Sequence, residues 1–336
     1  MDKLRWGVIG AGGIARRRTI PGMMLAENAE LVAVMDIRPD VAESVRDEFG
    51  IPRACGSEEE LLCDPEVEAV YIATPVVHHA AQVRHAADHG KHVLVEKPVA
   101  YSSEEAEAVV RYCRERGVLL GVGLMMRFGT HVRTMKELIA QGKIGRVVSA
   151  YSQFSDWMPD TVDTWFTRKE KAGGGCLLDM GVHVVDLMQY ILNTRCDRVM
   201  ALNETLSFSY DVEDSSTLIM RMENGAQCVV QTNFNVPGEA CRWRLEFFGD
   251  RGCLMGKDVI GQVDGGTLEA VFVEQPLMDA DPAPGILLPG EFGNFYTREI
   301  ESFSDSVLHE KPLVVPAEEA VRVQRILEEA YRGWER

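Results

Sequence analysis

Three titratable side chains interrupt an otherwise apolar stretch of the chain. The stretch reads GGGCLLDMGVHVVD over residues 173–186, and spacings of four and three residues place Asp179, His183 and Asp186 on one helical face. Because imidazole titrates near neutral pH, His183 could remove a hydroxyl proton while Asp179 orients the ring or holds a second substrate hydroxyl. By itself such a pair is more often a satisfied hydrogen bond in a core. Asp186 could support His183 or cap a neighbouring segment.

A glycine-rich turn near the N-terminus predicts a dinucleotide site. The apolar run WGVIG leads into GAGGIA at residues 10–15, a G-x-G-x-x-A motif in the strand–turn–helix context that such sites require. The first glycine permits a tight turn, the second lets the backbone approach a pyrophosphate, and the helix N-terminus supplies amide donors. We therefore expect Gly10, Gly12, Gly13 and Ile14 to contact a dinucleotide cofactor.

The end of the next predicted strand bears on the choice between NAD and NADP. Asp36 stands there, about 20 residues beyond the glycines, where a carboxylate can accept from the ribose hydroxyls. It would also repel a 2′-phosphate, which favours NAD. Arg38 keeps NADP open, because a guanidinium at that place could pair with the phosphate instead.

The elements that position these residues predict an α/β protein with two domains, over residues 1–123 and 124–336. The first part alternates helical patterns with the apolar runs LRWGVIG, ELVAVMD, VEAVYIATP, KHVLVEKP and VLLGVGLM, which predicts a parallel sheet covered on both faces. After about residue 125, consecutive strand-like runs separated by turns such as ENG and GDRG predict an α+β domain with an open, mostly antiparallel sheet. The segment MDADPAPGILLPGEFG is expected to be a loop.

Composition narrows the classes of partner and compartment. A net charge of −17 argues against nucleic acid and anionic membranes, which would repel the chain. The eight cysteines show no CxxC spacing, which fits reduced thiols in the cytoplasm. The start MDKLRWGVIGAGG lacks signal-peptide architecture, and no uninterrupted apolar run approaches the roughly 18 residues of a membrane span. We expect a soluble, cytoplasmic protein.

One pair of histidines has a spacing that could bind a metal ion. His85 and His89, in HAADH, are four residues apart and would share a helical face. Because the sequence shows no third ligand or nearby acid, a solvated helix is the favoured interpretation and no metal site is predicted.

Taken together, several motifs resemble the Gfo/Idh/MocA oxidoreductases, the family of glucose–fructose oxidoreductase and inositol dehydrogenase. They are GAGGIA, ATPVVHHAAQ, the EKP of KHVLVEKPVA, GGGCLLDMGVHVVD and NFYTREIESFSDSV, in that order and over essentially the whole chain. The resemblance implies an N-terminal Rossmann domain and a substrate-binding domain whose open sheet often forms a homodimer or homotetramer. It also implies hydride exchange between a nicotinamide and a carbon of a sugar or cyclitol.

The resemblance assigns roles to individual positions. Lys97 of EKP, Asp179 and His183 would be catalytic, with Lys97 hydrogen-bonded to the reacting oxygen. Residues implied to contact the cofactor are Thr74, Pro75, His79, Glu96, Lys97 and Arg127, whereas Val76 replaces a common asparagine. Trp157, Trp165 and Tyr296 are candidate substrate contacts, although the tryptophans could equally be core residues.

The favoured function is an NAD-dependent oxidoreductase acting on a secondary alcohol of a small sugar, sugar derivative or cyclitol. One alternative is a glycoside-processing enzyme that oxidises C3 transiently, eliminates the aglycone and retains NAD. Others are an NADP-linked sugar reductase and a non-catalytic nicotinamide sensor.

Overall fold

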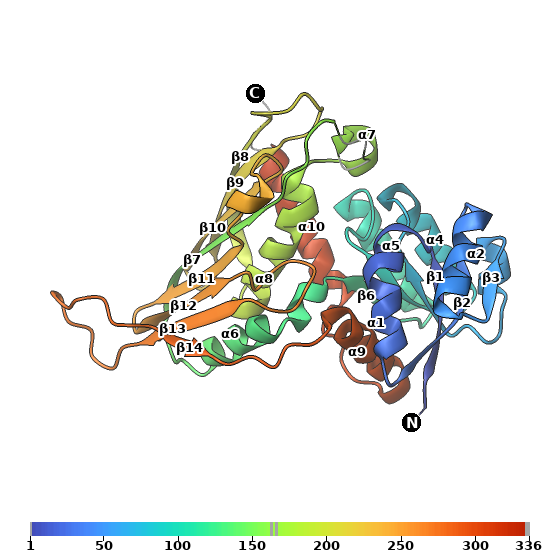
Figure 1. Ribbon diagram of the computed structural model, residues 1–336, viewed down its shortest axis with the longest axis horizontal. Helices are drawn as coiled ribbons and strands as arrows, with labels where there is room; N and C mark the ends of the chain where they lie inside the picture. The colour runs from blue at the N-terminus through green and yellow to red at the C-terminus, as the bar shows by residue number, and fades with distance from the viewer. Residues whose placement is uncertain (1, 162–163, 165–166, 333–336) are drawn as a thin grey trace. The chain divides into compact units, whose positions relative to one another are not determined.

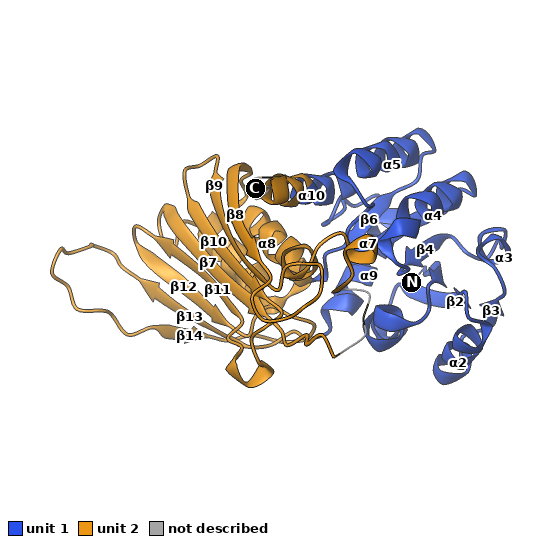
Figure 2. Cartoon of the chain, turned by 90° about the horizontal axis from the view of Figure 1, so that it is seen from above, with its two compact units in different colours: residues 1–125, 294–324 blue, residues 126–293, 325–336 orange. Residues whose placement is uncertain are grey.

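The computed structural model describes residues 2–161, 164 and 167–332, and the chain divides into two compact units (Figure 2). Unit 1 comprises residues 1–125 and 294–324, and unit 2 comprises residues 126–293 and 325–336. The predicted boundary after residue 123 divides a cofactor-binding domain from a substrate-binding domain, and this functional division stays a prediction. The compact units differ from it chiefly because residues 294–324 join the N-terminal unit.

Unit 1 is built on a six-stranded parallel sheet (Figure 1). Its strands are β1 (Leu4–Ile9), β2 (Ala29–Met35), β3 (Arg53–Cys55), β4 (Ala69–Ile72), β5 (His92–Glu96) and β6 (Leu120–Gly123). They lie in the order β3-β2-β1-β4-β5-β6, which is the Rossmann order and confirms that prediction. Strands β1 and β4 are buried at nearly every position, and for this reason they read as uninterrupted apolar runs.

Helices connect the strands of unit 1, and side-chain caps define where some of them begin. They are η1 (Ala15–Thr19) continued by α1 (Ile20–Leu25), α2 (Pro39–Phe49), α3 (Glu58–Leu62), α4 (Val76–Asp88), α5 (Ser103–Glu115), α9 (Phe295–His309) and α10 (Ala317–Arg332), whose last turns belong to unit 2. At the start of α5 the Ser102 hydroxyl accepts a hydrogen bond from the Glu105 amide at 3.2 Å, as serine commonly does at a helix N-cap.

The late helix α9 belongs to unit 1 because it packs on the N-terminal elements. The Trp6 indole N–H donates to the Ser304 hydroxyl at 3.1 Å, and the Trp6 and Phe303 rings lie 5.2 Å apart. The Thr297 hydroxyl donates to the carbonyl oxygen of Gly22 at 2.9 Å. A segment far away in the sequence therefore completes the N-terminal core.

Unit 2 contains an eight-stranded sheet that is antiparallel except between two central strands. Its strands are β7 (Val147–Ser155), β8 (Cys196–Glu204), β9 (Ser215–Met222), β10 (Gln227–Asn233), β11 (Arg244–Gly249), β12 (Gly252–Lys257), β13 (Thr267–Phe272) and β14 (Ile286–Leu288). The order is β14-β13-β12-β11-β7-β10-β9-β8, and only β7 and β10 pair in parallel. The predicted mostly antiparallel sheet is confirmed.

The prediction of a loop over residues 278–293 is wrong for residues 286–288, which form a strand. Residues 286–288 form β14, which pairs with β13 at the edge of the sheet, with Leu268 opposite Leu288. An edge strand as short as this one leaves too little alternation in the sequence to outweigh the surrounding prolines and glycines.

One face of the unit 2 sheet carries the helix that follows the glycine triplet. The helices of this unit include α6 (Thr130–Ala140), α7 (Lys169–Ala172), η4 (Leu177–Gly181) and α8 (Val182–Leu192), and α8 contacts β7 and β10. By length and composition, residues 169–192 could cross a membrane, but 78% of that apolar window is buried inside the structure. This burial is typical of a core helix.

Candidate active site

The glycine-rich turn of unit 1 has the geometry of a pyrophosphate cradle. Gly10 and Gly13 have φ values of 86° and 50°, a region that favours glycine. A Cβ at Gly10 would lie 2.9 Å from the carbonyl group of Ala73, whereas a Cβ at Gly13 would meet nothing within 4 Å. The backbone is thus held tightly on one side and open on the other, and Ile14 directly precedes η1. These residues fit a dinucleotide.

Asp36 links the predicted ribose position to this turn. Its Oδ2 accepts a hydrogen bond from the Gly12 amide at 3.2 Å, and its Oδ1 accepts one from the Arg38 amide at 3.0 Å. Each oxygen of a carboxylate can accept further hydrogen bonds, so these contacts leave capacity for a ribose hydroxyl. The Arg38 side chain is 66% exposed, with its Nε 3.8 Å from Asp36. Both the ribose acceptor and a cation for a 2′-phosphate are therefore present.

His79 joins the loop after β4 to the EKP segment. Its Nδ1 lies 2.8 Å from the carbonyl oxygen of Pro98, and its Nε2 lies 2.8 Å from the carbonyl oxygen of Thr74. Burial lowers the pKa of His79, although both carbonyl groups favour the cation. A neutral ring donates only one of these hydrogen bonds at a time. His79 itself is almost completely buried, so the structure assigns it a positioning task on Thr74 and Pro98.

The EKP carboxylate lies at the end of a hydrogen-bonded chain inside unit 1. The Thr19 hydroxyl donates to the Tyr71 hydroxyl at 3.0 Å, and Tyr71 donates in turn to Glu96 Oε1. Glu96 Oε2 accepts from the Lys97 amide at 3.2 Å. The Lys97–Pro98 peptide bond is cis, and Lys97 is half-buried at the end of β5. Glu96 therefore orients the backbone of the lysine.

Tyr296 lies in the interior of unit 1, although the sequence made it a candidate substrate contact. It is 3% exposed, and a Cβ at Gly22 of α1 would lie 2.8 Å from the Tyr296 Cβ. Burial raises the pKa of Tyr296, and nearby Glu96 and Glu299 act in the same direction. These contacts indicate a packing role, so we leave Tyr296 out of the proposed substrate site.

In unit 2, a buried glutamate holds the start of the helical segment that carries Asp179 and His183. Glu213 accepts hydrogen bonds from the Gly175 amide at 2.9 Å, the Leu177 amide at 3.0 Å and the Tyr331 hydroxyl at 2.8 Å. Amide groups in the first turn of a helix need hydrogen-bond acceptors, and the negative charge of a carboxylate there is attracted to the positive end of the helix dipole. No local pattern predicted Glu213, because it lies 36 residues beyond Leu177.

The glycine triplet makes room for this cap. A Cβ at Gly175 would lie 2.0 Å from the carbonyl oxygen of Glu213, and one at Gly174 would lie 2.3 Å from the Tyr331 hydroxyl. Gly173 ends α7 with a φ of 79°. Within unit 2 the observed neighbours of these glycines are protein atoms.

Arg127 and Asp186 form a buried ion pair rather than parts of an open site. Both Nε and Nη2 of Arg127 donate to the Asp186 carboxylate, at 2.8 and 2.5 Å, and both side chains are at most 2% exposed. The guanidinium also lies 4.7 Å from the centre of the Tyr190 ring. Asp186 thus fixes α8 to the segment before α6. The structure gives Arg127 a different partner from the predicted cofactor.

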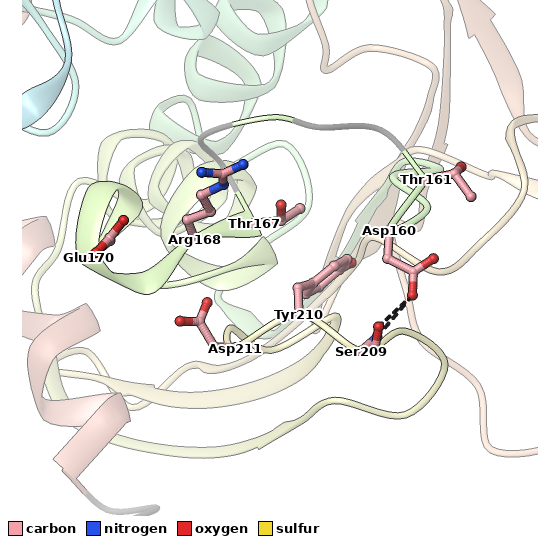
Figure 3. A pocket seen from close by; sticks show the side chains of 8 residues that line it. All are labelled: Asp160, Thr161, Thr167, Arg168, Glu170, Ser209, Tyr210 and Asp211. Carbon is pink, nitrogen blue, oxygen red and sulfur yellow. Dashed lines mark hydrogen bonds between the residues drawn. The ribbon is translucent and has the colours of Figure 1, made fainter.

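A polar cavity of about 700 Å³ opens in unit 2 near the loops before the glycine triplet (Figure 3). Its lining residues are Asp160, Thr161, Thr167, Arg168, Glu170, Ser209, Tyr210 and Asp211. Phe208 connects this region to Trp157, since its ring lies 5.2 Å from Trp157 and 5.5 Å from Tyr210. Trp157 is 45% exposed and so remains available to a ligand. Trp165, the other predicted tryptophan, lies outside the described residues.

The predicted catalytic residues are divided between the units. Lys97 belongs to unit 1, whereas Asp179 and His183 belong to unit 2. Asp179 lies in η4 and is half-buried, and His183 lies one turn later in α8 and is 6% exposed.

Cys176, next to the triplet, donates from its thiol to the carbonyl oxygen of Thr232, and burial raises the pKa of the thiol. Cys176 is therefore a packing residue.

Comparisons with known proteins agree with this architecture. Residues 4–124 match an oxidoreductase family with an NAD-binding Rossmann fold, and residues 132–255 match the GFO/IDH/MocA C-terminal domain. The 1,5-anhydro-D-fructose reductase of Ensifer adhaerens is 33% identical over 83% of this chain and 84% of its own length. The D-xylose 1-dehydrogenase (NADP(+)) 2 of Haloferax volcanii is 33% identical over 99% of this chain and 98% of its own.

A solved structure extends the likeness to a cofactor-bound protein. GenD2 from gentamicin A biosynthesis, in complex with NAD, superimposes with a TM-score of 0.80 at 27% identity, covering 99% of this chain and 94% of its own. A nicotinamide dinucleotide is thus the cofactor, and the chain is an NAD(P)-dependent oxidoreductase acting on CH–OH groups. The protein belongs to the Gfo/Idh/MocA family of oxidoreductases.

Proposed function

We propose that this enzyme transfers hydride between NAD and a secondary alcohol carbon of a sugar, a sugar derivative or a cyclitol. The names of its relatives support the substrate class, since both relatives described above are named for sugar substrates. The observation that carries the proposal is the EKP lysine at the end of β5 together with Asp179 and His183 one turn apart in a chain of this family.

The proposed chemistry assigns each side chain one task. Lys97 donates a hydrogen bond to the reacting oxygen and stabilises the negative charge that develops there. His183 accepts the hydroxyl proton, and Asp179 orients the imidazole or holds a second hydroxyl. A bound nicotinamide supplies the hydride acceptor, or the donor in the reverse direction. The Glu213 cap and the Arg127–Asp186 pair keep the helix of His183 in place.

An activity screen with two variants tests this assignment. Purified enzyme with NAD is incubated with inositols, hexoses, sugar phosphates and glycosides, and reduced nicotinamide is followed by absorbance. Lys97→Ala and His183→Ala should each lower kcat by at least about 100-fold, the usual contribution of a general acid or base. Both should retain NAD affinity within a few fold. Loss of NAD binding in either variant would mean that its role is wrongly assigned.

The screen also separates the remaining candidate activities. Cleavage of a glycoside without accumulation of NADH would replace the proposal with transient oxidation at C3 and elimination. Tight NAD binding with no turnover of any substrate would favour a nicotinamide sensor.

The preference for NAD rests on Asp36 and is opposed by Arg38. An NADP-linked reductase is the second candidate, because the Arg38 side chain is exposed beside Asp36 and one relative is named for NADP. Asp36→Ala should reduce the ratio of kcat/KM for NAD to that for NADP, since it removes the ribose acceptor and the repulsion of a 2′-phosphate. Arg38→Ala is the matched control and should shift the ratio toward NAD. An unchanged ratio in Asp36→Ala would remove the ribose assignment.

We further propose a homodimer or homotetramer as the working form. Exposed apolar side chains on the unit 2 sheet, among them Met200 and Ile219, support this proposal.

A further inference from the structure

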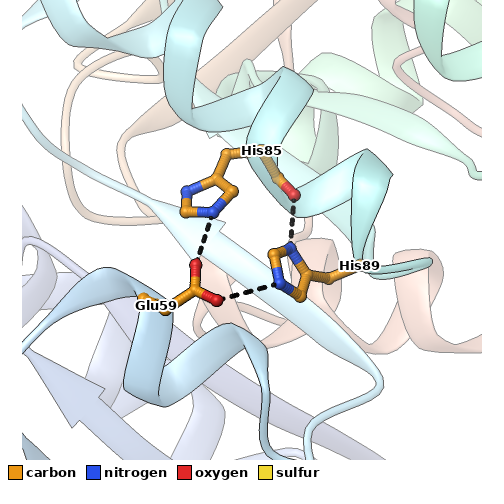
Figure 4. Close-up of side chains that lie close together, drawn as sticks. All are labelled: Glu59, His85 and His89. Carbon is orange, nitrogen blue, oxygen red and sulfur yellow. Dashed lines mark hydrogen bonds and ion pairs between the residues drawn. The ribbon is translucent and has the colours of Figure 1, made fainter.

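A cluster of metal-binding side chain types lies on the surface of unit 1, outside the proposed active site (Figure 4). Glu59 lies on α3, and Cys63 directly follows that helix. His85 lies on α4, and His89 ends it. The sequence showed only the two histidines, whereas the fold adds a carboxylate and a thiol from the other helix.

The Glu59 carboxylate lies within contact distance of the other three side chains, and the ligand atoms of Glu59, His85 and His89 all lie within 4.8 Å of one another. Glu59 Oε2 lies 2.8 Å from His85 Nε2, and Glu59 Oε1 lies 3.6 Å from His89 Nε2. Cys63 Sγ lies 3.1 Å from Glu59 Oε1 and 3.7 Å from His89 Nε2. The favoured interpretation from sequence, a solvated helix with no third ligand, therefore does not describe these histidines.

Both imidazole rings are held in the orientation that metal-binding histidines adopt. His85 Nδ1 lies 2.7 Å from Glu58 Oε1, and His89 Nδ1 lies 3.0 Å from the carbonyl oxygen of His85. A carboxylate or a backbone carbonyl group on one ring nitrogen fixes the tautomer and leaves the other nitrogen to bind the metal. In both residues Nε2 is the nitrogen that faces the cluster.

The spacing of the ligand atoms fits a tetrahedral zinc ion. Zinc bonds of about 2.0–2.2 Å to nitrogen and oxygen and about 2.3 Å to sulfur place neighbouring ligand atoms roughly 3.3–3.7 Å apart. The distances from His89 Nε2 to Glu59 and Cys63 already lie within this range. Two pairs are closer than this range, Glu59 Oε2 to His85 Nε2 at 2.8 Å and Cys63 Sγ to Glu59 Oε1 at 3.1 Å, and each would have to separate by roughly half an ångström.

We infer that Glu59, Cys63, His85 and His89 bind one Zn²⁺ ion. A thiolate with two imidazoles selects zinc over Mg²⁺ and Ca²⁺, which prefer oxygen ligands alone. On binding, the Cys63 thiol releases its proton to solvent and both histidines bind as neutral rings. Cys63 and Glu59 are exposed, so the ion can enter from water. Bound zinc would join α3 to α4.

The alternative is a metal-free polar cluster, because Glu59 already accepts hydrogen bonds from its neighbours. Titration of the untagged, metal-free full chain with Zn²⁺ distinguishes the two. We expect the chain to bind one equivalent of Zn²⁺ even in the presence of excess Mg²⁺. The zinc-bound protein should have a higher Tm than the metal-free protein. Cys63→Ser and His89→Gln should each lower zinc affinity at least tenfold. Glu58→Gln should lower it roughly 10-fold or more through His85.

Matched controls and a spectroscopic probe complete the test. Cys253→Ser and His309→Gln change the same residue types elsewhere and should leave zinc affinity unchanged. Co²⁺ in the wild type should give tetrahedral bands and a thiolate charge-transfer band that Cys63→Ser lacks. Equal zinc affinity in wild type and the Cys63→Ser/His89→Gln double variant would overturn the inference, as would a Co²⁺ spectrum without the thiolate band. Neither result depends on the enzyme's substrate.

Discussion

At the scale of single residues, Glu299 is a carboxyl group enclosed in unit 1. It is 4% exposed, and its Oε1 has no hydrogen-bond partner among the described residues. The groups that face it are Glu96 of β5, Tyr71 of β4 and Tyr296 of its own helix. Burial raises the pKa of Glu299 well above its ordinary value, and the negative charge of Glu96 raises it further. Folding therefore favours the protonated form of Glu299.

This shift predicts a loss of stability at high pH. A group whose pKa is raised by folding contributes stability that is complete below its unfolded pKa and is lost as pH rises through the folded pKa. Glu299→Gln cannot ionise, so its Tm relative to wild type should increase as the pH rises above the ordinary carboxyl pKa of 4.5. Glu301→Gln, on the same helix but more exposed, is the control and should show no such trend. A constant difference in Tm for Glu299→Gln would contradict the assignment.

At the scale of elements, the start of the η4–α8 segment can be capped by Glu213 only because Gly175 has no side chain. Gly175→Ala places a Cβ 2.0 Å from the carbonyl oxygen of Glu213, so the cap must move. Such overpacking costs about 1–3 kcal/mol in the free energy of unfolding. Because Asp179 lies one turn later, kcat should fall as well.

A matched glycine provides the control for that change. Gly238 has nothing within 4 Å of an added Cβ and no positive φ. Gly238→Ala should therefore change the free energy of unfolding by less than about 0.5 kcal/mol and leave kcat unchanged. Chemical denaturation and steady-state kinetics of both variants test the idea, and equal stability of the two would show that the cap adjusts without cost.

The same elements show what could be predicted from the sequence. Period and apolar density predicted the longer strands of both sheets and the helix of His183, because those signals are local. The three-residue strands β3 and β14 were missed, because so short a strand leaves too little alternation in the sequence. Contacts across long separations left no such trace. Glu213 caps a segment 36 residues earlier, Arg127 pairs with Asp186 across 59 residues, and Cys63 meets His89 across 26. Each of these contacts depends on how the fold brings distant segments together, and residue types alone do not specify that arrangement.

At the scale of the whole molecule, the unit 2 sheet presents apolar side chains on the face away from α8. Met200, Ile219 and Val229 lie opposite one another on β8, β9 and β10, and Leu287 stands at the other edge. Met200 is 73% exposed and Ile219 is 51% exposed, whereas their neighbours Leu218 and Met220 are fully buried. Grouped apolar exposure of this kind marks protein interfaces. We propose this face as the surface for the oligomerisation that the family resemblance implies.

The oligomer prediction can be tested by changing that surface alone. If this face mediates assembly, wild-type protein should have the mass of a homodimer or homotetramer by light scattering, because specific interfaces bury about 1,200–2,000 Å². Met200→Asp/Ile219→Asp puts two carboxylates on this surface, and an interface would have to bury them unpaired, so the double variant should form a smaller assembly with its secondary structure retained. Met278→Asp, at a 97% exposed position outside the strands of the sheet, should keep the wild-type mass. A monomeric wild type at micromolar concentration, or a double variant of unchanged mass, would show that this face does not mediate assembly.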